Sequence, residues 1–231
     1  MTNKQIQSFI NKLNANTYHK TIFKHQISKD VDFAKVWESQ KTKDILPFRF
    51  FFIKNKSNYV GAVLVMSRDL HWYITPEHRG KGYLSIALKN TILPYIFDVL
   101  EREEQYITIT ASQIGEVYFS SSCKVALNVG FKKVDTNNYL INAEDVSMPF
   151  ISIDTVYKGL EDSKIELIKT ELSAIAKRIN QIDTQLENAF GYDIRDYTNT
   201  TLSDISSKLA SHKFILEDIV QDFKEAKNNI K

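Results

Sequence analysis

The sequence predicts a mixed α/β domain in residues 1–150, followed by an antiparallel α-helical hairpin of the coiled-coil type in residues 151–231. Two patterns predict this division. Short β-branched and aromatic segments alternate with helical ones up to residue 142, as in mixed α/β domains. From residue 165 onward, apolar residues recur in steps of three and four, as in helices that pack with supercoiled seams. The hydrophobic fraction of 43% provides enough apolar material for a sizeable core.

The first 45 residues predict two short helices around one strand. The spacing of an amphipathic helix is met by Ile6, Phe9, Ile10 and Leu13. Residues 21–26 suit a short strand. Asp30 is placed to cap a second helix that carries Phe33, Val36 and Trp37.

Three strands with an antiparallel appearance follow. Residues 48–54 are rich in aromatic side chains, and residues 59–66 form a nearly unbroken apolar run, which is typical of a strand covered on both faces. Residues 70–75 make the third strand, which Pro76 ends. The polar segments between these strands predict tight turns.

A long helix is predicted next, because Leu84, Leu88, Ile92, Ile96 and Leu100 recur every four residues. Pro94 lies inside this helix and predicts a kink or a break, since proline removes one backbone hydrogen bond.

The rest of the domain predicts strand, helix, strand and strand. Residues 106–110 are β-branched and short, and residues 116–129 read as a helix that Gly130 ends. One face of that helix carries Phe119, Cys123, Ala126 and Leu127. Residues 131–134 and 139–142 complete the strands.

Two heptad series predict the hairpin. The first is Ile165, Ile168, Leu172, Ile175, Ile179, Ile182, Leu186 and Ala189. The second is Leu202, Ile205, Leu209, His212, Leu216, Ile219, Phe223, Ala226 and Ile230. Each helix would be about 45 Å long at 1.5 Å per residue. The polar connection over residues 190–200 lets the helices fold back on each other.

Composition excludes several classes of function. Thirty basic and 28 acidic residues give a net charge of +2, so no strong field draws the chain to nucleic acid or an anionic membrane. The single cysteine excludes an internal disulfide, and the first residues lack the apolar core of a signal peptide. We expect a soluble cytoplasmic protein. The five histidines show no metal-ligand spacing, so we expect no metal site.

The most informative segment joins the third strand to the long helix through Arg79-Gly80-Lys81-Gly82. A helix N-terminus offers unpaired N–H groups and positive potential, and glycines let a phosphate approach the backbone. Two cations add charge, so the segment predicts a pyrophosphate site. Its spacing matches neither a Walker A loop nor a dinucleotide fingerprint. The alternative is a tight, solvated strand–helix turn.

This segment resembles the acetyl-CoA-binding motif of the GNAT acetyltransferase family, R/Q-x-x-G-x-G/A, here Arg79 to Leu84. Leu84 departs from the small residue expected at the last position. Farther on, residues 125–131 end in Gly130-Phe131 and look like the family's second cofactor motif. The resemblance covers roughly residues 30–143 and does not include the hairpin.

The resemblance implies acetyl-CoA as the acyl donor, held between the strand before the turn and the strand at residues 106–110. The pantetheine arm would pair with backbone of the first strand, and the pyrophosphate would rest on N–H groups of the turn. Ser120 and Ser121 fall where the family places polar cofactor contacts, although they also suit a helix N-cap. The expected donor-binding residues are Tyr73, Ile74, Thr75, Arg79, Gly80, Lys81, Gly82, Tyr83, Leu84, Ser120 and Ser121.

The family's chemistry is direct attack of an amine on the thioester, which needs a base for the amine and an acid for the thiolate. Candidate bases are His71, which titrates near neutrality, and Asp69. His71 also suits a solvent-facing strand position, and Asp69 suits a turn. The family's usual acid position holds Ala126, so Tyr118 is the candidate acid, with a core tyrosine as the alternative. Cys123 suits a small core residue.

The sequence therefore predicts an acetyl-CoA-dependent N-acetyltransferase that acts on an amine of a small molecule or a protein. The runner-up is a catalytically weak domain that serves as a CoA-binding or interaction module through its hairpin. For the hairpin itself we favour a homodimer, because one seam buries only part of each helix. A hairpin that caps its own domain, or one that binds a different partner, is the alternative.

Overall fold

The computed structural model describes residues 1–39, 45–146, 157, 159–191 and 200–229. The chain forms two compact units, residues 1–156 and residues 157–231. The mixed α/β class and the helical hairpin are both confirmed. The boundary predicted between residues 150 and 151 lies outside the described residues. Among the residues described, no helix is long and apolar enough to cross a membrane.

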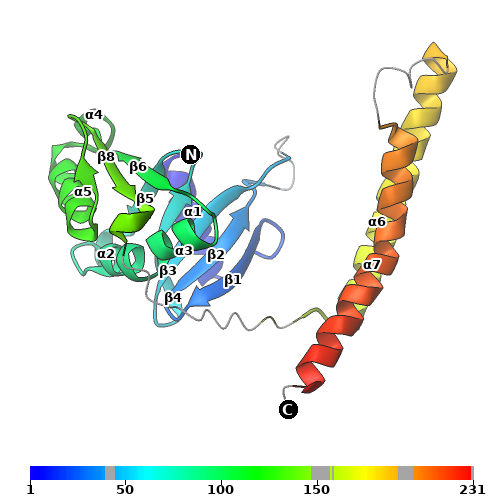
Figure 1. Ribbon diagram of the computed structural model, residues 1–231, viewed down its shortest axis with the longest axis horizontal. Helices are drawn as coiled ribbons and strands as arrows, with labels where there is room; N and C mark the ends of the chain where they lie inside the picture. Colours follow the sequence, from blue (N-terminus) through cyan, green and yellow to red (C-terminus); the bar gives the residue numbers. More distant parts are fainter. Residues whose placement is uncertain (40–44, 147–156, 158, 192–199, 230–231) are drawn as a thin grey trace. The chain divides into compact units, whose positions relative to one another are not determined.

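The first unit is built on a five-stranded antiparallel sheet whose strand order follows the chain (Figure 1). Its strands are β1 (Ile22–Ser28), β2 (Val31–Val36), β3 (Phe48–Asn55), β4 (Asn58–Val65) and β5 (Leu70–Ile74). All of the strands predicted between residues 21 and 75 are confirmed. Consecutive strands pair antiparallel because short turns join them and no crossover is needed.

β2 lies where the sequence pattern favoured a second helix, and that prediction is wrong. Phe33 and Val36 are three residues apart, which suits one face of a helix, but they belong to the core clusters on opposite faces of the sheet. A strand that is buried on both faces carries apolar side chains at both parities, so its spacing can mimic a helix.

Helices cover both faces of this sheet. α1 (Asn3–Asn14) is the predicted amphipathic helix and begins with a capping box between Thr2 and Gln5. Its apolar stripe packs on one face, against Phe50, Phe52 and Leu64. The opposite face is covered by the helical run of residues 83–98.

That helical run is not regular, as Pro94 predicted. It consists of α2 (Tyr83–Ala87), the π-helical turn η2 (Leu88–Ile92) and α3 (Leu93–Asp98). The N–H of Leu93 donates to the carbonyl of Leu88, five residues back, directly before the proline. The break therefore takes the form of a π turn, which lets the chain continue past a residue that has no N–H.

A second, smaller sheet has the strand order β6–β8–β7. Its strands are β6 (Glu104–Thr108), β7 (Lys132–Lys133) and β8 (Asn138–Asn142). The helices between β6 and β7 are α4 (Ala111–Ile114) and α5 (Glu116–Val129). Gly130 ends α5 with φ of 107°, a conformation that favours glycine. Leu127, predicted to face inward, is 54% exposed, and Val129 is buried in its place.

The second unit is the hairpin of α6 (Asp162–Phe190) and α7 (Leu202–Asn229), which run side by side in Figure 1. Two ion pairs set its register: Lys169 with Glu217 at 2.5 Å and Lys224 with Asp162 at 2.7 Å. Near the middle of the hairpin, the hydroxyl of Ser206 donates to the carbonyl of Ala176 at 2.8 Å. This contact brings the two backbones close together.

The register of the seam differs from the predicted heptads. Ile175, Ile182, Ile205 and Ile219 were all predicted to lie in the seam, but they are 51%, 37%, 42% and 58% exposed. The buried positions are instead their C-terminal neighbours Ala176, Asp183 and Ser206. Leu172, Ile179 and Leu202 belong to the seam in both registers, and we call such residues shared seam positions. The helices meet on the residue four places after a shared seam position, whereas the apolar pattern favours the residue three places after it.

Candidate functional site

The site begins where β5 and β6 are joined. The N–H of Tyr106 donates to the carbonyl of Arg68 at 3.2 Å, and the N–H of Thr108 donates to the carboxylate of Asp69 at 3.0 Å. Asp69 also accepts from the N–H of Leu70 at 2.8 Å. The Asp69 side chain therefore links the two strands at the start of β5, in addition to ending the turn as the sequence suggested.

A buried glutamine strengthens this junction. Gln105 is fully buried, and its side-chain amide donates to the carbonyl of Arg68 at 2.9 Å and to that of Tyr106 at 2.7 Å. Its amide oxygen accepts from the guanidinium of Arg102, which also donates to the carbonyl of Met66 at 2.6 Å. Sequence reasoning missed both residues, since neither stands in a motif.

Beyond this junction β5 is an edge strand of its sheet. β4 and β5 pair Gly61 with Ile74, and the N–H of Thr75 donates to the carbonyl of Val60 at 3.0 Å. Antiparallel strands alternate their bonding direction, so the N–H and C=O of Ile74 point away from β4. Ile74 thus offers its backbone to the side of β5 that faces β6.

The expected backbone pairing is therefore limited to fewer residues than the resemblance implied. Besides its bonded N–H, Thr75 accepts from the N–H of His78 at its carbonyl, and its hydroxyl lies 2.8 Å from Nδ1 of His78. Thr75 is 2% exposed. Tyr73 has the same strand parity as Thr75, so its backbone groups point to β4. Of the three residues named for this role, only Ile74 has an outward backbone edge.

The strand then turns into the helix through η1 (Pro76–His78) and two glycines. Gly80 and Gly82 have φ of 72° and 81°, which disfavours any residue with a Cβ. A Cβ on Gly80 would meet no atom within 4 Å, so the space beside the turn is open. Gly82 is the N-cap of α2, and no side chain caps this helix end. The N–H groups that begin the helix thus face an open approach.

Two exposed cations stand at this turn, Arg79 and Lys81. Arg79 is folded back on the strand, with Nε donating to the carbonyl of Ile74 at 3.0 Å. Its guanidinium lies 4.6 Å from the ring centre of Tyr118 and 5.8 Å from that of Tyr73. Arg79 therefore connects the free edge of β5 with α5.

The neighbouring side chains of the motif divide between core and surface. Leu84, which departs from the family pattern, is 9% exposed and packs in the core, so it does not block the exposed helix end. Tyr83 is half-buried, and its ring lies 6.1 Å from that of His78. On α5, Tyr118 is 48% exposed, which excludes the core-tyrosine alternative.

Ser120 and Ser121 are exposed on α5, one turn after its start at Glu116. The N-cap of α5 is Gly115, so the alternative of serine capping is wrong. Cys123 is partly buried against the core, as expected of a small core residue. A hydrogen bond with its thiol raises the pKa of Tyr139 to about 12.

His71 lies on β5 and points to the α1 side of the sheet. Its Nε2 is 2.8 Å from the amide oxygen of Asn3, and two residues along the strand the hydroxyl of Tyr73 donates to Gln7 at 2.7 Å. An amide oxygen can only accept, so Nε2 carries the hydrogen and the neutral ring keeps its lone pair on Nδ1. Burial lowers the pKa of His71 below its ordinary value of 6.5.

The α1 residues Asn3 and Gln7 are a further part of the site that sequence reasoning missed. They are four residues apart and so lie on one side of the helix. That spacing, opposite alternating polar residues on a strand, is the only signal that the sequence contains. Among the described residues, no cluster of histidine, cysteine and acidic side chains could hold a metal ion.

No protein-family model matches the chain, and no curated protein matches it either. Solved structures do match. One is a GNAT-family acetyltransferase from Bacillus anthracis, with 16% identity and a TM-score of 0.36 over 42% of this chain. The match spans 66% of that protein, slightly less than two thirds.

Two other similar structures are N-acetyltransferases. PseH from Campylobacter jejuni, solved with acetyl coenzyme A, has 14% identity and a TM-score of 0.33, over 42% of this chain and 68% of PseH. Variant forms of the spermidine/spermine N-acetyltransferase SpeG from Vibrio cholerae have 15% identity and a TM-score of 0.35. That match covers 62% of this chain and 92% of SpeG.

Proposed function

We propose that the α/β unit is an N-acetyltransferase that takes an acetyl group from acetyl-CoA and passes it to an amine. One observation carries the proposal: the helix N-terminus after β5 has no side-chain cap, is opened by two left-handed glycines and stands beside two exposed cations. Such an end binds phosphate groups. It directly follows the outward backbone edge of β5, which suits the extended amide chain of pantetheine.

The donor would bind in two parts. The pyrophosphate accepts hydrogen bonds from the N–H groups of residues 80–84, and Lys81 and Arg79 supply positive charge. The pantetheine amides pair with the N–H and C=O of Ile74, which requires that Arg79 leave the Ile74 carbonyl. Ser120 and Ser121 on α5 supply hydroxyls that reach the donor from the other side.

The reaction is attack of the neutral amine nitrogen on the thioester carbon. The new C–N bond forms as the C–S bond breaks, the amine loses one proton and the CoA thiolate gains one. His71 is the better of the two candidate bases, because both described contacts of Asp69 tie its carboxylate to backbone N–H groups. The half-exposed Tyr118 is the proposed acid for the thiolate.

The role of His71 has a test in pH dependence. Because burial lowers its pKa below 6.5, His71 stays neutral and able to accept a proton at neutral pH, and activity falls only as the pH drops below 6.5. We expect His71→Ala to lower turnover by roughly 10²–10⁴ and to remove this acid limb, with little change in CoA affinity. If the His71→Ala variant keeps the acid limb of the pH profile, that limb belongs to another group.

The acceptor is an amine on a small molecule or a protein. The cofactor half of the site is the same for every acceptor, so the class has to come from a panel of candidates. The panel should include spermidine, free lysine and peptides with unblocked N-termini, with release of free CoA thiol as the signal.

The proposal as a whole is tested by calorimetry with acetyl-CoA on the full chain. We expect Arg79→Ala combined with Lys81→Ala to weaken binding by about 2–4 kcal/mol, because two charge-assisted phosphate contacts are lost. Lys89→Ala is the matched control, since Lys89 is an exposed cation on the same helical run. A Kd of roughly 1 mM corresponds to a binding free energy of about −4 kcal/mol. If no binding is detected with acetyl-CoA at that concentration, the proposal of an enzyme is wrong.

A second candidate is a donor-binding or interaction module without turnover. The specific observation in its favour is that Ala126 is fully buried, so the position of the family's usual acid faces the core and carries no hydroxyl. This candidate requires CoA binding without thiol release from any amine, and the same two assays distinguish it from the enzyme.

A further inference from the structure

The two helices of the hairpin turn some polar residues inward and several isoleucines outward, which is unfavourable for a hairpin in water without a partner. Asp183 and Ser206, at 8% and 1% exposure, lie inside, whereas Ile175 and Ile219, at 51% and 58%, lie outside. Exposing isoleucines forgoes the hydrophobic gain of burial, and the hydrogen-bonded Ser206 inside the hairpin does not replace that gain. The apolar residues therefore serve a contact that one copy of the hairpin does not make with itself.

The outer isoleucines gather on one face of the hairpin. On each helix they stand three residues after a shared seam position, and the inner residues stand four after it. The two helices run in opposite directions, so this same rotation brings both outer stripes to the same side. We call this the isoleucine face; it comprises Ile168, Ile175 and Ile182 of α6 and Ile205, His212 and Ile219 of α7.

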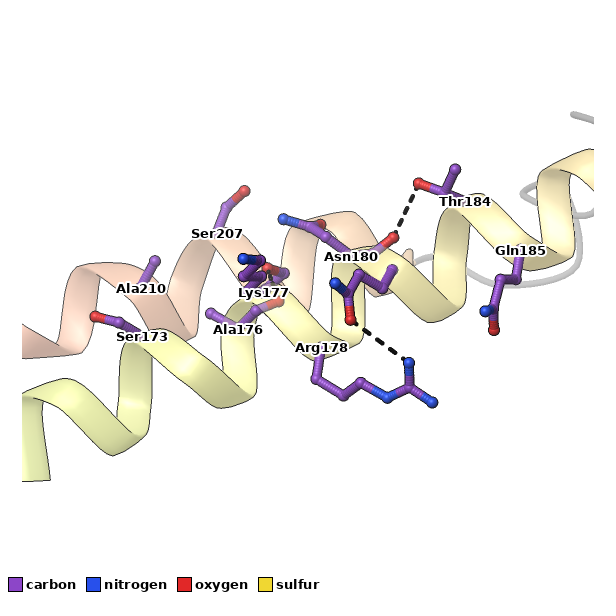
Figure 2. A pocket seen from close by; sticks show the side chains of 11 residues that line it. Ser173, Ala176, Lys177, Arg178, Asn180, Thr184, Gln185, Ser207 and Ala210 are labelled. Atoms are coloured by element: carbon purple, nitrogen blue, oxygen red, sulfur yellow. Dashed lines mark hydrogen bonds between the residues drawn. The ribbon is translucent and has the colours of Figure 1, made fainter.

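A groove elsewhere on the hairpin has a different character. It has a volume of about 770 Å³ and is lined by alanines and by polar or charged side chains, among them Ser173, Ala176 and Ser207 (Figure 2). In Figure 2, Arg178 and Gln185 point to the opposite side of α6 from Thr184. The lining of this groove contains no large apolar residue, so the isoleucine face is a separate surface.

We propose that the isoleucine face binds the identical face of a second copy of this chain and forms a four-helix bundle. The register of the hairpin supports this occupant. The ion pair of Lys169 with Glu217 places Ile175, six residues farther along α6, level with residue 211, next to His212. Ile175 and His212 are each the middle member of their stripe, so one two-fold axis across the hairpin passes through both centres.

That axis makes the face complementary to itself. It sets Ile175 against its own copy, Ile168 against Ile182 of the second copy, and Ile205 against Ile219 of the second copy. Every isoleucine of the face then meets another isoleucine. The His212 side chains meet at the centre, where one polar layer fixes the register.

The charges along the rim favour the same arrangement. Glu171 and Arg178 are exposed beside the α6 stripe, one heptad apart. The axis across the hairpin brings Glu171 opposite Arg178 of the second copy, twice per dimer. An axis parallel to the helices would instead bring Arg178 opposite Lys208 of the second copy, a repulsive pair. Charge complementarity therefore selects the antiparallel dimer.

The first test is light scattering on the full chain. We expect twice the chain mass of 26.7 kDa. Ile175→Asp should weaken self-association at least about a hundredfold, since two carboxylates would meet on the axis. Leu167→Asp is the matched control: Leu167 is 60% exposed on the same helix, off the isoleucine face, and its replacement should leave the dimer intact. Helix content by circular dichroism should be unchanged in both.

The second test uses the rim charges to identify the arrangement. E171R and R178E should each weaken the dimer about tenfold, and the double variant should restore it. Mixing the two single variants should give heterodimers, because each copy then carries one charge sign. A monomeric wild-type chain overturns the proposal and leaves the α/β unit or a different protein as the occupant. The proposal is also overturned if Ile175→Asp leaves the dimer intact, or if mixing E171R with R178E gives no preference for heterodimers.

Discussion

The two units of this chain differ in how completely they bury their large apolar side chains. In the α/β unit, Phe50, Phe51 and Phe52 are all fully buried, because β3 is covered on both faces. In the hairpin, Asp183 and Ser206 are buried together with Ile165 and Ala176, whereas Ile175 and Ile219 are exposed. The comparison shows that the first unit completes its own core, whereas the second leaves large apolar side chains exposed.

The largest effect should come from the core of the α/β unit. Phe51 packs against Phe33 and Tyr95: its ring centre lies 5.1 Å from that of Phe33 and 5.5 Å from that of Tyr95. We expect Phe51→Ala to lower the free energy of unfolding by about 3–5 kcal/mol, from lost burial and a residual cavity. Both tryptophans, Trp37 and Trp72, belong to this unit, so their fluorescence in urea measures it alone. A loss below about 1 kcal/mol would contradict the picture of a self-sufficient core.

A smaller effect should come from the buried charge of the same unit. Asp32 is 2% exposed and accepts from Lys24 at 2.9 Å, Tyr59 at 2.6 Å and Lys54 at 2.5 Å. Burial alone would favour the protonated carboxyl, but these bonds hold the pKa of Asp32 below its ordinary 3.8. This buried charge therefore has three partners, one each on β1, β3 and β4.

We expect Asp32→Asn to destabilise the α/β unit by about 1–3 kcal/mol at neutral pH, a range that allows for the partial exposure of both lysines. Because the folded pKa is lowered, the contribution of Asp32 is present above pH 3.8 and is lost as the pH falls through the folded value. Urea midpoints of wild type and variant should therefore converge in acid. If the two midpoints stay equally far apart in acid, the stabilisation comes from the packing of the side chain and not from the charge of the carboxylate.

The smallest effect should come from the hairpin in dilute solution. Ile175 is 51% exposed there, so Ile175→Ala should change the stability of the helices by less than about 1 kcal/mol. Leu172→Ala, at a shared seam position that is partly buried, is the comparison and should cost more. Thermal melts followed by circular dichroism at low protein concentration measure both. A large loss for Ile175→Ala would show that one copy already covers this residue.

Much of the α/β unit could be predicted, because its strands carry strong local patterns. β2 could not, since Asp32 and Lys35 interrupt its apolar residues and the three-residue spacing of Phe33 and Val36 also suits a helix. In the hairpin, each seam residue is followed by inward candidates three and four places on. The apolar pattern favours Ile175, whereas the small size of Ala176 and Ser206 permits the close approach that the helices adopt.

For the candidate site, the sequence predicted the glycine turn because its chemistry is local: two glycines, two cations and a helix start lie within a few residues. Asn3 contacts His71 across 68 positions of chain, and Gln7 contacts Tyr73 across 66. Contacts between residues so distant depend on how α1 packs on the sheet. No spacing rule reaches them.

Under the proposed function, the bond between Arg79 and the Ile74 carbonyl makes donor binding an exchange equilibrium. The guanidinium gives up a neutral acceptor and two aromatic rings and gains a phosphate, so the net affinity is the difference between the two sets of contacts. Lys81 faces solvent and has no such partner to give up among its described contacts. The net contribution of Arg79 should therefore be smaller than that of Lys81, and titrations of the two single alanine variants would separate them.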